Sequence, residues 1–172
     1  MNLRDRLQPA LLDRLTDLAP LSNVEAEDTR VMNKTQIREA VLRDLSWLLN
    51  SVQPLNKAVA AKYPQAADSV LNYGLPAMSG QLASRVDVSQ LERTIKQAIL
   101  RFEPRVMEDS LEVKALEASS VLDTHNVIEF EIRGHLWSQP VPLEILLRTQ
   151  LDLEAGQVEV RDVAAASPSK VR

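Results

Sequence analysis

The sequence predicts an α+β fold in which helices pack on one face of an antiparallel sheet of about four strands. In three stretches before position 104, apolar residues recur at intervals of three and four, which is the spacing of one helix face. Beyond that position they alternate with polar residues, as in strands that are buried on one face and solvated on the other. Helices that precede strands, instead of alternating with them, are typical of the α+β class.

Composition excludes several classes of protein. The 172 residues, 45% hydrophobic and 26% charged, suit one compact domain. The absence of cysteine excludes disulfides, thiol nucleophiles and cysteine-ligated metals. A net charge of −4 gives no reason to expect nucleic-acid binding. The start of the chain lacks the unbroken apolar run of a signal peptide or a membrane span, so we expect a cytoplasmic protein without direct membrane insertion.

The first expected element is an amphipathic segment over residues 2–18. Pro9 predicts a break or a restart of the helix within it. A short terminal stripe of leucines either packs on its own domain or docks on a partner, and the spacing leaves both interpretations open. The leucines at helical spacing are Leu3, Leu7, Leu11, Leu12, Leu15 and Leu18.

Domain boundaries follow from where the periodicity starts and stops. The acidic stretch 20–32 has no apolar period and is interpreted as a linker. We therefore predict an N-terminal amphipathic segment with its linker over residues 1–32 and a folded domain over residues 33–163. Residues 164–172 offer little to pack and are expected to form a disordered tail.

The first long helix is expected over residues 35–51. Its apolar stripe includes Leu45, which we expect in a core shared with the sheet. Asn33 and Gln36 have the spacing of a capping box, in which each side chain accepts a backbone N–H of the other residue.

The second long helix is expected within residues 87–104. Ser89 and Glu92 have the spacing of a capping box at its start. It ends before Pro104, because a proline disfavours helical geometry in the preceding residue. Between the two helices, residues 68–72 are expected to form a helical turn that Gly74 ends in left-handed geometry.

Four alternating stretches predict the strands of the sheet. Loops at residues 122–126 and 154–157 have the lengths of hairpin turns. The alternation covers residues 111–115, 128–133, 143–151 and 158–161.

Few side chains are candidates for catalysis or metal binding. His125 and His135 lie ten residues apart, without the spacing of metal ligands. Glu129 and Glu131 share a strand face at roughly 6.5–7 Å, a separation found in two-carboxylate hydrolases. Their neighbours on that face are charged, so neither carboxyl has a reason for a raised pKa. We therefore expect no catalytic residues, no metal and no cofactor.

The turn after the second helix, Glu103-Pro104-Arg105, has two interpretations. It is either a helix stop with a surface ion pair, worth no more than about 1 kcal/mol, or a fixed acid–base pair presented to a partner. We expect both charged side chains at the surface, two positions apart and projecting the same way.

Four motifs in this order resemble the TssE family, baseplate subunits of the bacterial type VI secretion system. That family is similar to the contractile-phage tail-baseplate wedge proteins labelled lysozyme-like. The resemblance covers about residues 10–163. It rests on LLDRL at 11–15, RDLSWLLN at 43–50, SVLNYGLP at 69–76 and I-x-x-A-I-x-x-FEPR at 95–105.

The resemblance implies a non-enzymatic structural subunit that joins other baseplate wedge proteins, on which the sheath polymerises for effector export. Sheath and spike proteins are further candidate partners, and the baseplate would assemble in the cytoplasm near the inner membrane. The resemblance also implies partner-docking residues, which in this sequence are Glu103, Pro104 and Arg105, together with Leu11, Leu12 and Leu15 of the leucine-rich start.

Two other functions compete with this hypothesis. A peptidoglycan-cleaving muramidase associated with the tail would match the lysozyme-like label, although no carboxylate pair in the sequence supports it. A free regulatory adaptor would act without any secretion apparatus.

Overall fold

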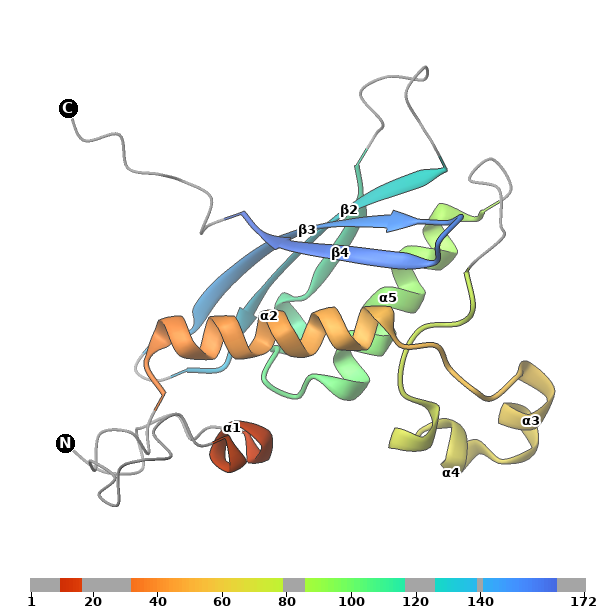
Figure 1. Cartoon of the computed structure of the whole chain (residues 1–172), viewed down its shortest axis with the longest axis horizontal. Coiled ribbons are helices and arrows are strands. Elements are labelled where there is room, and N and C mark those ends of the chain that lie inside the picture. Colours follow the sequence, from red (N-terminus) through yellow and green to blue (C-terminus); the bar gives the residue numbers. More distant parts are fainter. Residues whose placement is uncertain (1–9, 17–31, 79–85, 117–125, 139–140, 164–172) are drawn as a thin grey trace.

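The computed structural model describes residues 10–16, 32–78, 86–116, 126–138 and 141–163 (Figure 1). The predicted tail, most of the predicted linker, residues 2–9 and 17–18 of the N-terminal segment, His125 and the expected hairpin turn before Asn126 lie outside these ranges. The described elements are α1 (Leu11–Leu15), α2 (Lys34–Asn50), α3 (Lys57–Lys62), α4 (Pro64–Ala67), η3 (Val70–Asn72), α5 (Val88–Phe102), η5 (Glu108–Ser110), β1 (Glu112–Ala115), β2 (Val127–Leu136), β3 (Leu143–Asp152) and β4 (Gln157–Asp162).

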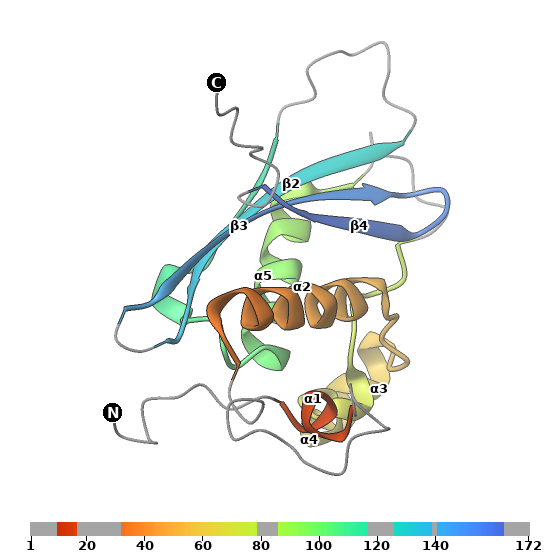
Figure 2. The same ribbon diagram turned by 60° about the vertical axis from the view of Figure 1, so that its left-hand side comes forward.

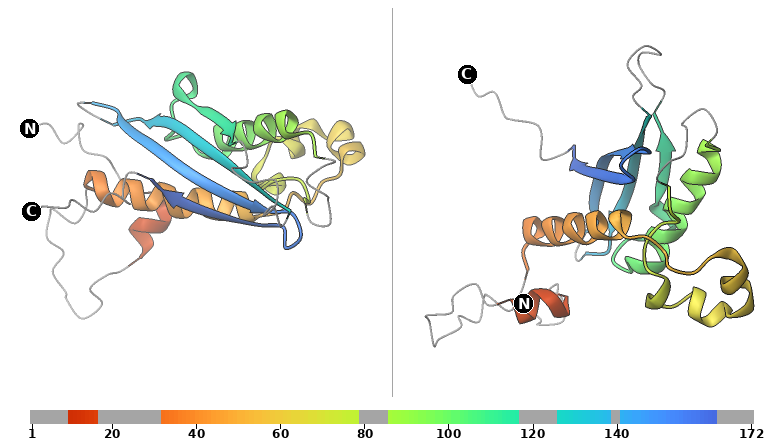
Figure 3. Two further views of the ribbon diagram at one scale, coloured as in Figure 1. Left: turned by 90° about the horizontal axis from the view of Figure 1, so that it is seen from above. Right: turned by 45° about the vertical axis from the view of Figure 1, so that its right-hand side comes forward.

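The four strands form one antiparallel sheet in the order β1-β2-β3-β4, which confirms the predicted fold class. Helices α2 and α5 lie on the same face of the sheet, as the views from two sides show (Figures 1 and 2). α2 packs against β4, and α5 packs against β1. Seen from above, the strands run obliquely across both helices (Figure 3).

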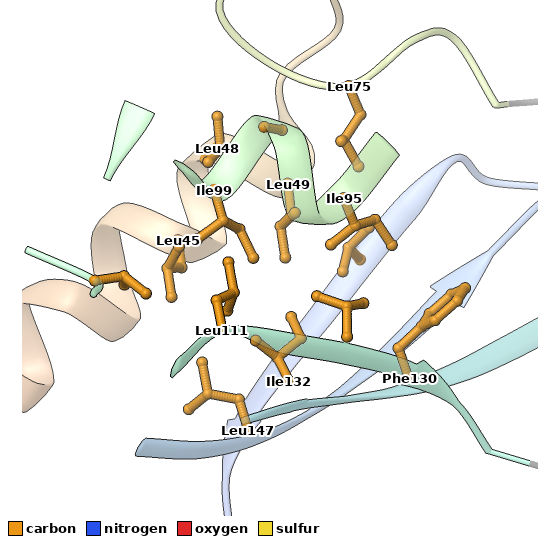
Figure 4. Packing of buried hydrophobic residues seen from close by; sticks show 14 of the residues in the cluster. Leu45, Leu48, Leu49, Leu75, Ile95, Ile99, Leu111, Phe130, Ile132 and Leu147 are labelled. Atoms are coloured by element: carbon orange, nitrogen blue, oxygen red, sulfur yellow. The ribbon is translucent and has the colours of Figure 1, made fainter. Parts of the chain in front are cut away.

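The core lies between the sheet and the two long helices (Figure 4). Leu45 of α2 and Phe130 of β2 are fully buried there. Residues on the opposite face of the sheet, such as Glu129 and Arg133, are exposed. The sheet is therefore buried on one side only, as the alternation predicts.

The helix boundaries agree with their capping residues, with one correction. The predicted capping box of α2 is confirmed, because Asn33 and Gln36 exchange both hydrogen bonds. The capping box predicted for α5 is wrong: the side chain of Asp87 caps that helix by accepting from the Gln90 backbone N–H. Glu92 instead accepts a hydrogen bond of 2.7 Å from the backbone N–H of Ala115 in β1.

The predicted helical turn at residues 68–72 is shorter than expected. The structure has the short helix α4 before it and a single 3-10 turn, η3, within it. Ser69 caps η3, since its hydroxyl accepts from the Leu71 backbone N–H at 3.2 Å and thereby sets where the turn begins.

Each outer strand of the sheet is tied to a helix by a polar side chain. Asn50, the last residue of α2, donates to the Val158 carbonyl at 2.8 Å and accepts the Val158 N–H at 2.9 Å. Glu92 makes the equivalent contact from α5 to β1. These contacts satisfy edge-strand backbone groups and fix both helices relative to the sheet.

Replacing Leu45 with alanine should lower the free energy of unfolding by about 2–5 kcal/mol, because it leaves a cavity in the core. Glu39→Ala on the exposed face of the same helix is the matched control and should change it by less than about 0.5 kcal/mol. Urea melts of both variants provide the measurement. Equal losses in the two variants would contradict the assignment of the buried helix face.

Candidate functional site

The turn at Glu103, Pro104 and Arg105 follows α5 and lies beside the end of β2. The Glu103 N–H donates to the Ile99 carbonyl at 2.8 Å, and this bond closes the helix. The Trp137 N–H then donates to the Arg105 carbonyl at 2.8 Å, which fastens the turn beside the sheet. Pro104, between these anchors, is exposed. The backbone of the turn is therefore held from both sides while its proline faces solvent.

Glu103 is buried, with 3% of its surface exposed, so the expectation that both charged side chains lie at the surface is wrong for this residue. Its carboxylate accepts hydrogen bonds from the Arg105 backbone N–H at 3.1 Å and from Arg105 Nε at 2.6 Å. Arg105 Nη2 donates to the second carboxylate oxygen. These donors offset the loss of water around the buried charge. Arg105 itself is half-buried.

Arg105 also reaches α2, where its Nη2 pairs with Asp44. The other oxygen of Asp44 accepts from Arg43 Nε at 2.9 Å. Arg43 Nη1 in turn pairs with Asp13 of α1 at 2.7 Å. Five charged side chains thus form one chain of ion pairs, in the order Glu103, Arg105, Asp44, Arg43 and Asp13, which we call the relay.

The relay alters the titration of the groups around it. Burial alone would lower the pKa of the Arg105 guanidinium, but Glu103 and Asp44 outweigh burial and raise that pKa above its ordinary value. The hydrogen bond with Asp13 is the main cause that raises the pKa of Arg43. Burial, helped by the charges of Asp44 and Glu103, raises the pKa of the Tyr73 hydroxyl. Both arginines therefore stay charged and Tyr73 stays neutral at physiological pH.

A cleft of about 420 Å³ opens beside the turn. The Tyr73 and Phe102 rings meet edge to face in it, with centroids 5.1 Å apart. Trp47 on its wall is exposed, whereas both carboxylates in it are bound to arginine. The cleft thus offers a partner apolar and aromatic surface. It is lined by Ala10, Asp44, Trp47, Leu48, Tyr73, Phe102, Glu103, Pro104 and Arg105.

The structure brings α1 to this cleft, since Ala10 lines it and Asp13 belongs to the relay. The predicted docking leucines are all exposed: 71% for Leu11, 46% for Leu12 and 73% for Leu15. The two sets of predicted docking residues, separated by almost ninety positions in the sequence, are therefore linked through α2.

The bend at residues 69–76 positions one wall of the cleft. Gly74 has φ +116°, and a Cβ there would lie 2.3 Å from the Ser51 carbonyl oxygen, so the position requires glycine. Asn72 is buried and its amide accepts from the Leu55 N–H and donates to the Ala67 carbonyl. These contacts hold Tyr73 where its hydroxyl reaches the Asp44 carbonyl at 3.4 Å.

The other residues considered for chemistry lie apart from the cleft. Glu129 and Glu131 project from the solvated face of the sheet, where Gln150 donates to Glu129 at 2.7 Å and Arg133 pairs with Glu131 at 3.4 Å. His135 is exposed on the same strand. Across the described residues, no cluster of three or more histidines, aspartates and glutamates is arranged to hold a metal ion. No helix in this part of the chain is both long and apolar enough to cross a bilayer.

The sequence matches a known protein family. The model of the family described as baseplate wedge protein gp25 matches residues 35–141, a span that includes α2, α5 and the turn. The chain belongs to this family of baseplate wedge proteins. The family-level resemblance inferred from the motifs is therefore confirmed, and the role of this chain is that of a structural baseplate component.

The chain is similar to a chain in a structure described as the baseplate complex from the type VI secretion system, with 18% identity and a TM-score of 0.44. The match covers 67% of this chain and 94% of that one. Among curated protein sequences, none matches.

Replacing Glu103 with glutamine should lower the free energy of unfolding by about 1.5–3 kcal/mol, because the buried hydrogen bonds lose their charge while the shape is kept. The matched control is Glu131→Gln, which removes an ion pair with the exposed Arg133 and should change stability by less than about 1 kcal/mol. Denaturant melts measure both. Similar losses would mean that the relay does not stabilise the turn.

Proposed function

We propose that this protein is a TssE-type structural subunit of a type VI secretion baseplate, which docks with other wedge subunits and supports sheath assembly for effector export. Membership of the wedge family supports the structural role. The four motifs in their order, with the leucine-rich LLDRL start, favour the secretion branch over the phage proteins. On this proposal the protein acts in the cytoplasm, in a baseplate near the inner membrane.

The observation that carries the proposal is the rigid turn with its exposed proline. Pro104 has a fixed φ, and the backbone on both sides of it is hydrogen-bonded. Little backbone entropy is therefore lost when a partner binds there. Burial of Glu103 refines its role: Glu103 orients Arg105, while Pro104 and the accessible edge of Arg105 meet the partner.

The leucines of α1 supply the apolar part of the docking surface. Leu11 and Leu15 are among the most exposed large apolar residues described. Burying a leucine side chain contributes roughly 1.5–3 kcal/mol, enough for a few such residues to hold a specific contact. We propose that another baseplate wedge subunit covers them; sheath and spike proteins are the other partners that the proposal allows.

Replacing Leu11 and Leu15 together with serine should reduce co-purification with baseplate subunits by about tenfold or more and impair sheath assembly in cells, with an unchanged thermal melt. The matched control replaces Val59 and Tyr63 with serine, because these side chains of α3 and its C-cap are exposed to 37% and 52% and do not line the cleft. The control should retain assembly. If both double variants assemble sheaths equally well, the leucines are not a docking surface.

The proposal also excludes peptidoglycan cleavage. Purified protein added to cell walls should leave turbidity and the muropeptide pattern unchanged, with a lysozyme as positive control, because the carboxylates of the cleft are bound to arginine. If this protein released muropeptides and the Glu103→Gln variant did not, the result would support the muramidase hypothesis instead.

A further inference from the structure

The short helix α1 contacts its own domain through a charged side chain and turns its leucines outward. The side chain of Asp13 is only 8% exposed, whereas Leu11 and Leu15 on the same helix are 71% and 73% exposed. An amphipathic helix that packs for stability buries its leucines and exposes its charges. The reversed orientation indicates that α1 is positioned to present an apolar face.

We propose that Asp13, Arg43 and Asp44 hold α1 beside the Glu103-Pro104-Arg105 turn, so that leucines and turn form one continuous surface for a single wedge subunit. The inference rests on the proposed baseplate function and deepens it. It assigns Asp13, Arg43 and Asp44 as positioning residues, which contact no partner themselves and act through the groups that they orient.

Arg43 has the geometry that such a link requires. Its Nη1 binds Asp13 of α1, while Nε binds Asp44 of the same helix α2. The guanidinium also lies over the Trp47 ring, 5.1 Å from its centroid, which restrains its plane. A lysine ammonium could not serve both carboxylates with the same fixed directions, because it is a compact point charge on a flexible stem.

Asp44 joins the two halves of the surface. One of its oxygens accepts from Arg43 and the other pairs with Arg105. The position of the turn and the position of α1 are therefore set by the same carboxylate. Ala10, just before α1, lines the cleft together with Pro104 and Trp47, so the two halves adjoin in space.

The side chains that remain exposed on this surface indicate the chemistry of the partner. The charges of the relay are already paired with one another, while Leu11, Leu15 and Trp47 remain exposed. A wedge subunit that covers both halves must therefore present a mainly apolar face. Asp13 binds Arg43 through Oδ1, and its Oδ2 is buried without a hydrogen-bond partner among the described residues.

The positioning role can be tested without any partner. The chain has no cysteine, so spin labels can be placed at Thr16→Cys and Glu39→Cys in the full-length protein. Distances between the labels should be narrowly distributed in the otherwise native chain and broad after Arg43→Gln. The control is Arg133→Gln on the far face of the sheet, which should keep the narrow distribution. An unchanged distribution in Arg43→Gln overturns the proposal.

The shared surface is tested by a cycle of variants. Arg43→Gln, the Leu11→Ser and Leu15→Ser pair, and their combination are compared by the amounts of baseplate subunits that co-purify with each tagged chain. Each change alone should reduce the amount of co-purified baseplate subunits by about tenfold or more. The combined variant should recover as much of these subunits as the leucine pair alone. Effects that multiply would mean two separate surfaces and would overturn the proposal.

The two tests separate this inference from the proposed function. If the labels broaden but the leucine pair co-purifies normally, the leucine docking surface fails, and the composite surface fails with it. If the leucine pair loses its partners while Arg43→Gln keeps both the narrow distance and the partners, docking stands and only the relay is refuted. Arg43→Lys should fall between the native chain and Arg43→Gln in both measurements.

Discussion

The carboxylate of Asp44 is the constraint on which the candidate site depends. Its two oxygens bind two arginines, one from its own helix and one from the turn after α5. Through them, α1, α2 and the turn are held in one arrangement. Because Arg105 is the ion-pair partner of the buried Glu103, removing Arg105 would leave that carboxylate buried and unpaired.

The hydrophobic core fixes the elements that carry the relay. α2 is fixed by its buried leucines and by the contact of Asn50 with β4, so the side chains on its outer face start from a rigid base. The turn is fixed by hydrogen bonds to α5 and to the end of β2. The left-handed bend at Gly74 adds Tyr73 to the wall of the cleft. A small domain thereby presents an exposed proline and exposed leucines on a base with little freedom to move.

The same arrangement explains why the site suits assembly better than catalysis. Its acidic groups are bound to arginine, and its exposed side chains are apolar or aromatic. Large apolar side chains beside a preorganised turn are typical of the centres of protein interfaces. Membership of the baseplate wedge family agrees with that chemistry.

The sequence predicted what depends on local pattern. The capping box at Asn33, the helix stop before Pro104 and the alternation of the strands are all local, and each agrees with the structure. The sequence-based prediction was wrong where a residue distant in the sequence takes up a side chain. Glu92, predicted to cap α5, instead accepts a hydrogen bond from the backbone N–H of Ala115 in β1. The pairing of Arg105, the partner of the buried Glu103, with Asp44 likewise joins residues 61 positions apart.

No pattern in the sequence indicates that the five charged residues of the relay pair with one another. Asp44 and Arg43 belong to the polar side of an amphipathic helix, where most charges are solvated. Their pairing with Asp13 and Arg105 becomes visible only when segments 30 and 61 residues apart are placed together.

The most direct test is the energetic coupling between Asp44 and Arg105. The free energies of unfolding of the native chain, Asp44→Asn, Arg105→Gln and the double variant form a complete cycle. A shared ion pair predicts that the double variant loses less than the sum of the single losses, by at least about 1 kcal/mol. Losses that add to within about 0.5 kcal/mol would show that the two side chains act independently and would contradict the account.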